Sequence, residues 1–245
     1  MLELYNAPIS TCSQKVRMVL AEKQLDWVDH RLSFQKGEHL SPAYLAINPN
    51  GVVPTLVHDG TPVIESTVIN EYLDEVFVHG PRLVPQLPLA RAHMRAWRQY
   101  IDEVATPSIR YPSFNTFFVV NLAKMSDETF QAAAESRPLR RDFYLKMGRE
   151  GFTQDEIDAA LRRLRQTLER MEAALAKTRW LAHDDFTLAD VSIMPSIVRL
   201  EDLGLSQMWA DLPQVGDWYA RLQQRPSFAT TYYPGTRDLG PNVQI

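Results

Sequence analysis

The chain has 245 residues, of which 45% are hydrophobic, so it is long enough to bury one large core or two modest ones. Its 26 basic and 30 acidic residues give a net charge of −4, which argues against nucleic acid as a partner. The single cysteine, Cys12, excludes an intramolecular disulfide. No apolar run approaches the roughly 18–20 residues that span a bilayer, and no signal-peptide pattern precedes the first strand. We therefore expect a cytoplasmic protein with no membrane partner.

The first third of the chain alternates short strand and helix patterns. Strands are predicted over residues 2–5, 27–32, 55–57 and 63–64. Helices are predicted over residues 13–23, from Ser41-Pro42 onward, and over residues 66–76. The buried face of the last helix is predicted to consist of Val68, Ile69, Tyr72 and Leu73. The order β-α-β-α-β-β-α predicts a thioredoxin-like α/β domain over residues 1–78.

The remainder of the chain is predicted to be helical. Prolines at positions 81, 85 and 88 mark a linker over residues 79–89. Helices are predicted over residues 89–104, after the capping box at Thr153, after a second capping box at Thr187, and over residues 212–223. These elements predict an all-α domain over residues 90–231, followed by a C-terminal tail, 232–245, that either folds over the ligand-binding cleft or is disordered.

The segment from Asn48 to Ser66 carries the most specific chemistry. Pro54 begins a strand without a ladder donor, which suits a sheet edge or a cis bond after Val53. A cis bond would direct the N–H and C=O groups of Val53 toward an extended peptide. Ser66 at a helix N-terminus suits a carboxylate, and Glu65 suits an ammonium group. These features together fit the γ-glutamyl end of glutathione.

Four motifs resemble the cytosolic glutathione S-transferase family. They are residues 48–54, Glu65-Ser66, the loop Lys36–Ser41 and the capping box within Phe186–Asp190. The resemblance implies a thioredoxin-like domain, a helical domain, and a homodimer whose cleft takes glutathione as cosubstrate, with no metal. It also implies that Val53 and Pro54 contact the glutathione peptide. The loop is similar to the theta-type loop, which implies that His39 lies near the glycine carboxylate of glutathione.

The segment from Tyr111 to Phe152 is longer than the connection between the fourth and fifth helices in most members of this family. This insert is similar to the bacterial β-etherase branch, whose members cleave aryl ether bonds with glutathione. Tyr111 and Phe114 have a spacing typical of a core, but one of them is also predicted to line the pocket for a hydrophobic electrophile. A run of basic residues in the insert is interpreted as a solvated face, with a site for an anionic group of the substrate as the less favoured alternative: Arg137, Arg140, Arg141, Lys146 and Arg149.

Ser10 is the residue predicted to handle the glutathione thiol. Alignment through Val16 with serine-type members places Ser10 on the activating hydroxyl, with Thr11 as a neighbouring donor. A hydroxyl beside a helix N-terminus lowers a thiol pKa because it stabilises the thiolate. Ser10 can also serve as a simple helix cap, and the two roles are compatible.

Cys12 supports a different reaction. A cysteine at a helix N-terminus has a lowered pKa and can form a mixed disulfide with glutathione, as in a thiol transferase or reductase. Cysteine-type families, however, place their sulfur where Ser10 lies, and Cys12 can also be a partly buried residue near the pocket. We predict a transferase that adds glutathione to an aromatic electrophile or displaces a leaving group, with β-ether cleavage as its most specific form. A glutathione-binding module without catalytic activity is the remaining alternative.

Overall fold

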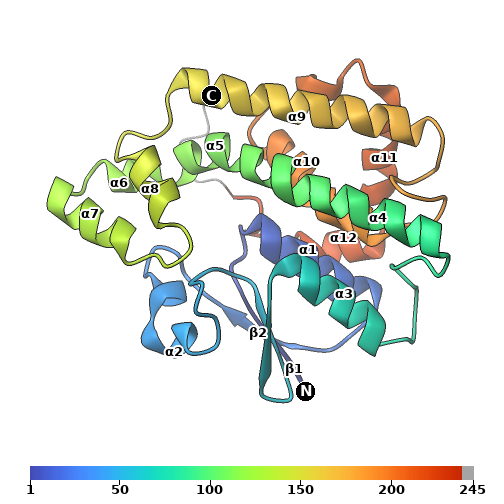
Figure 1. The fold of residues 1–245 in the computed structure, drawn as a ribbon, viewed down its shortest axis with the longest axis horizontal. Coiled ribbons are helices and arrows are strands. Elements are labelled where there is room, and N and C mark those ends of the chain that lie inside the picture. Colours follow the sequence, from blue (N-terminus) through green and yellow to red (C-terminus); the bar gives the residue numbers. More distant parts are fainter. Residues whose placement is uncertain (239–245) are drawn as a thin grey trace.

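The computed structural model describes residues 1–238, and its N-terminal part is a small sheet with helices packed on it (Figure 1). The sheet has the strand order β2-β1-β3-β4, with β1 and β2 parallel and the other neighbours antiparallel. The elements are β1 (Leu2–Asn6), α1 (Thr11–Glu22), β2 (Val28–Arg31), α2 (Pro42–Leu45), β3 (Thr55–His58), β4 (Thr61–Ile64) and α3 (Ser66–Val76). This arrangement confirms the predicted thioredoxin-like order and fold class.

Helices α1 and α3 lie between the sheet and the helical part of the chain (Figure 1). Leu4 of β1 pairs with Leu56 of β3, and both side chains are buried among the apolar residues of α1 and α3. The predicted buried face of α3 is wrong at one position. Ile69 and Leu73, one helical turn apart, are fully buried, whereas Val68 is 56% exposed. Val68 lies on the flank of α3 that faces a cavity described below.

The C-terminal part is helical, as predicted. A continuous run comprises α4 (Pro88–Tyr100), a π-helical turn (Ile101–Ala105) and α5 (Thr106–Phe117), so the predicted helix over residues 89–104 continues to Phe117. The other helices are α6 (Val119–Leu122), α7 (Asp127–Glu135), α8 (Arg141–Met147), α9 (Gln154–Leu175), α10 (Leu188–Asp202), α11 (Pro213–Gln223) and α12 (Pro226–Thr231). Helices α6, α7, α8 and α12 were not predicted. Within residues 1–238, no helix has the length and apolar character needed to cross a membrane.

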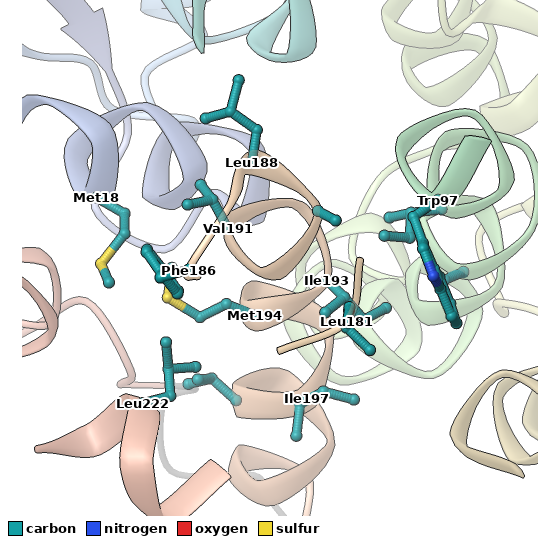
Figure 2. Close-up of a cluster of buried hydrophobic side chains, with 14 of the residues drawn as sticks. Met18, Trp97, Leu181, Phe186, Leu188, Val191, Ile193, Met194, Ile197 and Leu222 are labelled. Carbon is teal, nitrogen blue, oxygen red and sulfur yellow. The ribbon is translucent and has the colours of Figure 1, made fainter. Parts of the chain in front are cut away.

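Helix α10 is the centre of the main core. Its residues from Leu188 to Leu200 are all buried, and Figure 2 shows it between α1 and α4. The side chain of Ile193 lies on the side toward Trp97 of α4, and Val191 lies on the side toward α1 (Figure 2). The capping boxes predicted at Thr153 and Thr187 are both formed, with reciprocal bonds between each threonine and the acid three residues later.

The insert forms a second, smaller core beside the main one. Helices α6, α7 and α8 project from the end of α5 and lie above α2 (Figure 1). The rings of Phe34 and Phe118 are 6.1 Å apart, which brings the insert against the loop before α2. The buried side chains of this second core are Leu122, Phe130, Ala134, Tyr144, Met147 and Phe152.

The described part of the predicted tail packs against α1. Gln14 donates a 3.2 Å hydrogen bond from Nε2 to the carbonyl of Thr236. The ring of Tyr233 lies 4.4 Å from the guanidinium of Arg31 and 5.3 Å from that of Arg17. Residues 232–238 therefore fold back on the first domain, while residues 239–245 of the predicted tail lie outside the described part of the chain.

Candidate functional site

A cavity of about 350 Å³ lies between the two parts of the chain. One wall, here called the sheet-domain wall, is formed by the start of α1, the turn before β3 and the start of α3. The opposite wall, the helical-domain wall, is formed by the π-helical turn, α5 and the segment between α7 and α8. The lining residues are Cys12, Val52, Val53, Pro54, Glu65, Ser66, Thr67, Val68, Asp102, Thr106, Arg110, Leu139 and Arg140. A cleft of this size, with apolar walls and several polar groups, is a typical small-molecule site.

The turn before β3 is held in place by side chains behind it. The Val53–Pro54 peptide bond is cis. Tyr44 donates from its hydroxyl to the carbonyl of Val52 at 2.6 Å, and Asn48 donates to the same carbonyl from Nδ2 at 2.9 Å. Within residues 1–238, the N–H and C=O groups of Val53 make no hydrogen bond. They are therefore free to pair with an extended ligand in the cavity.

Glu65 and Ser66 lie at the start of α3, on the same wall. Glu65 has φ +69°, a conformation that non-glycine residues adopt rarely and often at functional sites. Its carboxylate accepts a 3.2 Å hydrogen bond from Asn50 and is otherwise exposed. Ser66 is the first residue of the helix, where the free N–H groups and the helix dipole favour an anion.

Ser10 caps α1 in the way that its sequence position suggested. Its Oγ accepts a 3.3 Å hydrogen bond from the N–H of Ser13, which leaves the hydroxyl hydrogen available to donate. The loop before it is held by two arginines that the sequence analysis did not identify. Arg17 donates to the carbonyl of Pro8 at 2.8 Å, and Arg199 of α10 donates to the carbonyl of Ile9 at 2.7 Å.

Cys12 lines the cavity, whereas Ser10 and Thr11 are half-buried and are not among its lining residues. Cys12 is half-buried as well, and its thiol is free. The geometry therefore brings Cys12 together with Val53, Glu65 and Ser66, and places Ser10 two residues earlier, at the N-cap of α1.

His39 is buried beneath the insert and is absent from the lining of this cavity. Its ring meets the ring of Phe34 edge-on, with the centroids 5.0 Å apart. Burial lowers the pKa of His39 to about 4, and the charge of Arg137 acts in the same direction. The imidazole is therefore neutral near pH 7, and its Nδ1 has no hydrogen-bond partner within the described residues. In this state it can form a hydrogen bond with a ligand but not an ion pair.

Tyr111 and Phe114 contribute to the second core instead of the cavity wall. The rings of Tyr111 and Phe152 are tilted against each other with centroids 4.2 Å apart, and the ring of Phe114 lies 5.0 Å from that of Phe143. Both pack against the second core, and neither is among the residues that line this cavity.

Other residues that line the cavity were not predicted from the sequence, because no local motif contains them. Asp102 lies in the π-helical turn, accepts 3.0 Å and 2.6 Å hydrogen bonds from Lys15 and Thr67, and so joins α1, α3 and the helical part. Burial alone would raise its pKa, but the Lys15 ammonium and these bonds hold the pKa of Asp102 below its usual range. Arg110 of α5 also faces the cavity. Within residues 1–238, no cluster of three or more His, Cys, Asp or Glu side chains is arranged to hold a metal ion.

Known proteins resemble this chain over nearly its whole length. The family model described as "Glutathione S-transferase, N-terminal domain" matches residues 9–76, and "Glutathione S-transferase, C-terminal domain" matches residues 136–226. Protein LigF of Sphingobium sp. (strain NBRC 103272 / SYK-6) is 34% identical over 97% of this chain and 95% of its own length. Glutathione S-transferase TCHQD of Arabidopsis thaliana is 26% identical, over 99% of this chain and 95% of its own.

The fold agrees with these sequence matches. The crystal structure of the β-etherase LigF from Sphingobium sp. strain SYK-6 superposes with a TM-score of 0.84 at 30% identity, covering 94% of this chain and 98% of that one. The cavity is lined by residues of both the sheet domain and the helical domain. The chain belongs to the glutathione S-transferase family and is a glutathione transferase.

Proposed function

We propose that glutathione lies along the sheet-domain wall of the cavity, with its thiol at the start of α1. The unpaired backbone groups of Val53, next to Pro54, pair with the peptide. Ser66 binds the γ-glutamyl carboxylate at the helix N-terminus, and Glu65 binds the ammonium group. His39 forms a neutral hydrogen bond with the glycine end of the tripeptide. The observation that carries this proposal is that one cavity holds Val53, Glu65 and Ser66 together.

Ser10 is the proposed thiolate-stabilising residue, with Thr11 as a neighbouring donor. The cap leaves the Ser10 hydroxyl hydrogen free, and the first turn of α1 adds its dipole. A donor aimed at the sulfur favours the anion, which lowers the thiol pKa and increases the fraction of nucleophile at neutral pH. The bonds from Arg17 and Arg199 hold this loop in place.

The proposed reaction is displacement of an aryloxide from an aromatic ether. The thiol loses its proton, the sulfur forms a bond to the carbon that carries the oxygen, and the C–O bond breaks. The aryloxide leaves with the electron pair and takes up a proton, so the products are a glutathione thioether and a phenol. The likeness to the β-etherase LigF over nearly the whole chain supports this choice of leaving group. The protein acts as a homodimer in the cytoplasm, with glutathione and a hydrophobic electrophile as its partners.

Ser10 variants test the thiol assignment. Ser10→Ala should lower kcat/KM by about a hundredfold and raise the pKa of the thiol of bound glutathione. The absorbance of the thiolate measures this pKa. Ser10→Ala should also cost about 1 kcal/mol of stability through the lost cap. Ser10→Thr keeps both the hydroxyl and the cap and should retain most of the activity. If Ser10→Ala changes neither the absorbance nor the turnover, the assignment is wrong.

Substrate choice needs a separate measurement. Turnover of an aryl β-ether should exceed turnover of a generic aryl halide once each rate is divided by its uncatalysed rate. The opposite ranking would leave a glutathione transferase with a different electrophile. Glutathione binding without turnover of either compound would indicate the non-catalytic binding module.

A second candidate function is favoured by the position of Cys12 on the cavity wall. In a thiol transferase, the Cys12 thiolate attacks a glutathione mixed disulfide, forms a Cys12–glutathione disulfide and releases the other thiol. A second glutathione then attacks that disulfide, which frees Cys12 and produces oxidised glutathione. Cys12→Ser abolishes this activity and leaves Ser10-dependent ether cleavage intact, so the pair of variants separates the two functions.

A further inference from the structure

Two arginines lie on the helical-domain wall of the cavity. Arg110 belongs to α5, and Arg140 immediately precedes α8 in the insert. They come from segments 30 residues apart in sequence that the fold brings to one cavity. Each is half-buried, so each guanidinium is reachable from the cavity while its stem packs against protein.

Neither guanidinium is neutralised within the described part of the chain. Residues 1–238 provide no hydrogen bond and no ion pair within 4.0 Å to Arg110 or Arg140. The two acids that share the cavity are engaged elsewhere: Asp102 accepts from Lys15 and Thr67, and Glu65 accepts from Asn50. The cavity therefore presents two guanidiniums that no carboxylate of the described residues contacts within 4.0 Å.

Without a bound anion, the placement of these two guanidiniums in one cavity is energetically unfavourable. Burial lowers the pKa of Arg110 and the positive charge of Arg140 lowers it further, and the opposite effect of Cys12, Asp102 and Glu65 does not cancel this shift. Desolvation of a charged group is unfavourable unless an opposite charge or a hydrogen-bond partner compensates for the lost water. An anion between the two guanidiniums would offset both the desolvation and the repulsion. A carboxylate fits best, since its two oxygens accept parallel hydrogen bonds from a guanidinium.

The side of the cavity indicates which substrate carries the anion. The groups assigned to glutathione lie on the sheet-domain wall, at the turn before β3 and the start of α3. The arginines lie opposite, on α5 and the insert, where the second substrate binds under the proposed function. We infer that Arg110 and Arg140 form a subsite for a carboxylate carried by the aromatic electrophile. This inference rests on the proposed function and defines its substrate class more narrowly.

Two neighbouring arginines in the basic run of the insert have different surroundings. Arg141 follows Arg140 directly, yet its side chain is 54% exposed and lies 3.7 Å from Asp142. It fits the solvated face that the sequence suggested. Arg140 does not, because it turns toward the cavity. Arg141 is therefore the matched control for Arg140.

Two related chloronitroarenes test the subsite. With 4-chloro-3-nitrobenzoate and its methyl ester, the glutathione thiolate attacks the ring carbon and chloride leaves with the electron pair. Each kcat/KM is divided by the uncatalysed rate with glutathione. Arg110→Gln and Arg140→Gln should each lower the value for the benzoate about tenfold or more and change the ester less than about threefold. Arg110→Lys should recover part of the loss, and Arg141→Gln should match wild type.

A binding measurement keeps the inference testable if neither compound reacts. Isothermal titration calorimetry with 3-nitrobenzoate, in the presence of unreactive S-methylglutathione, reports the subsite without chemistry. Wild-type protein should bind the benzoate at least about tenfold more tightly than 3-nitrobenzamide, and Arg110→Gln should remove the difference. Failure of turnover with this preference intact would count against the proposed reaction and not against the subsite.

Two outcomes would overturn the inference. The first is an equal loss for benzoate and ester in Arg110→Gln and Arg140→Gln, because the guanidiniums would then act on the reacting atoms. The second is weaker binding of glutathione itself in these variants, with no discrimination between benzoate and benzamide. In that case the arginines hold a carboxylate of the tripeptide. Melting temperatures of all variants, compared with that of Arg141→Gln, show whether a lost activity reflects unfolding.

Discussion

Arg199 donates a 2.7 Å hydrogen bond from Nη2 to the backbone carbonyl of Ile9. The bond runs from the central helix of the helical domain to the loop that ends at Ser10. Arg199 is almost fully buried, and burial lowers its pKa to about 10, so it remains charged at neutral pH. The position of the candidate thiol-binding loop is therefore set partly by the other domain.

The first prediction concerns this bond. Arg199→Lys removes the planar group that reaches Ile9, so the loop before Ser10 should become less ordered. We expect kcat/KM to fall about tenfold, the pKa of bound glutathione to rise, and stability to fall by about 1–3 kcal/mol. Thiolate absorbance against pH and urea unfolding measure these effects.

Arg225→Lys is a suitable control for that experiment. Arg225 also joins the helical domain to α1, through two 2.7 Å hydrogen bonds to Glu22, but at the opposite end of the helix from Ser10. Arg225→Lys should lower the stability of the protein without changing the pKa of the bound glutathione thiol. Equal thiol pKa values in the two variants would contradict a positioning role for Arg199.

The second prediction concerns Gly51, where the insert meets the turn before β3. Gly51 has φ +60°, and a Cβ there would lie 2.9 Å from Leu40 Cδ2 and 3.2 Å from Pro138 Cδ. Gly51→Ala should cost about 1–2 kcal/mol for the left-handed backbone, plus about 1–3 kcal/mol for overpacking. Gly60 has φ +80° with open space around it, so Gly60→Ala should show the backbone cost alone. Similar midpoints for the two variants in urea would rule out close packing of the insert at Gly51.

The third prediction concerns Asp190, the acid of the second capping box. Its carboxylate accepts hydrogen bonds from the N–H groups of Leu181 and Thr187, both at 3.0 Å, and from Trp218 Nε1 at 2.9 Å. Asp190→Ala leaves these buried donors unpaired and should cost about 3–5 kcal/mol. Asp190→Asn keeps an acceptor oxygen and should cost less. Thermal unfolding measures both, and a loss below about 1 kcal/mol in the alanine variant would refute this structural role.

The fourth prediction concerns pH. The pKa of His39 is about 4 in the folded protein, against an ordinary value of 6.5. Between these values the unfolded chain binds the proton more readily, so this residue makes stability fall as pH falls from about 6.5 toward 4. The full effect is no more than about 3 kcal/mol, and about 2 kcal/mol of it should appear by pH 5.

His39→Gln isolates that contribution because it removes the titrating ring. Urea unfolding at pH 7.5 and pH 5 should give a smaller pH-dependent loss in the variant than in wild type. Identical losses of stability in the two proteins would mean that folding does not lower the pKa of His39.

Much of the fold could be predicted because its signals are local. The capping boxes at Thr153 and Thr187 and the proline at the start of α2 each act within one helical turn. The segment from Asn48 to Ser66 could be predicted equally well, since its turn, strand and helix start follow one another in sequence. These signals depend on neighbours a few residues away, so they survive without knowledge of the tertiary structure.

The misassigned positions depend on packing between distant segments. Val68 was placed in the core by apolar character, but the cavity lies on that flank of α3. One of Tyr111 and Phe114 was expected to line the pocket, and both pack against the second core formed within the insert. The role of His39 stays a prediction, but its burial could not be foreseen from the sequence. No periodicity in the chain reports where the insert folds back.

The sequence alone determined the family resemblance, the thioredoxin-like order and the segment suited to glutathione, because backbone geometry and helix ends are encoded by adjacent residues. The tertiary structure decided which side chains share the cavity. It joined Asp102 to Lys15, brought Arg110 and Arg140 to one wall, and fastened the loop before Ser10 to Arg199. These contacts link residues tens to hundreds of positions apart, and their charges acquire a partner, or lack one, only after the helices and the insert have packed.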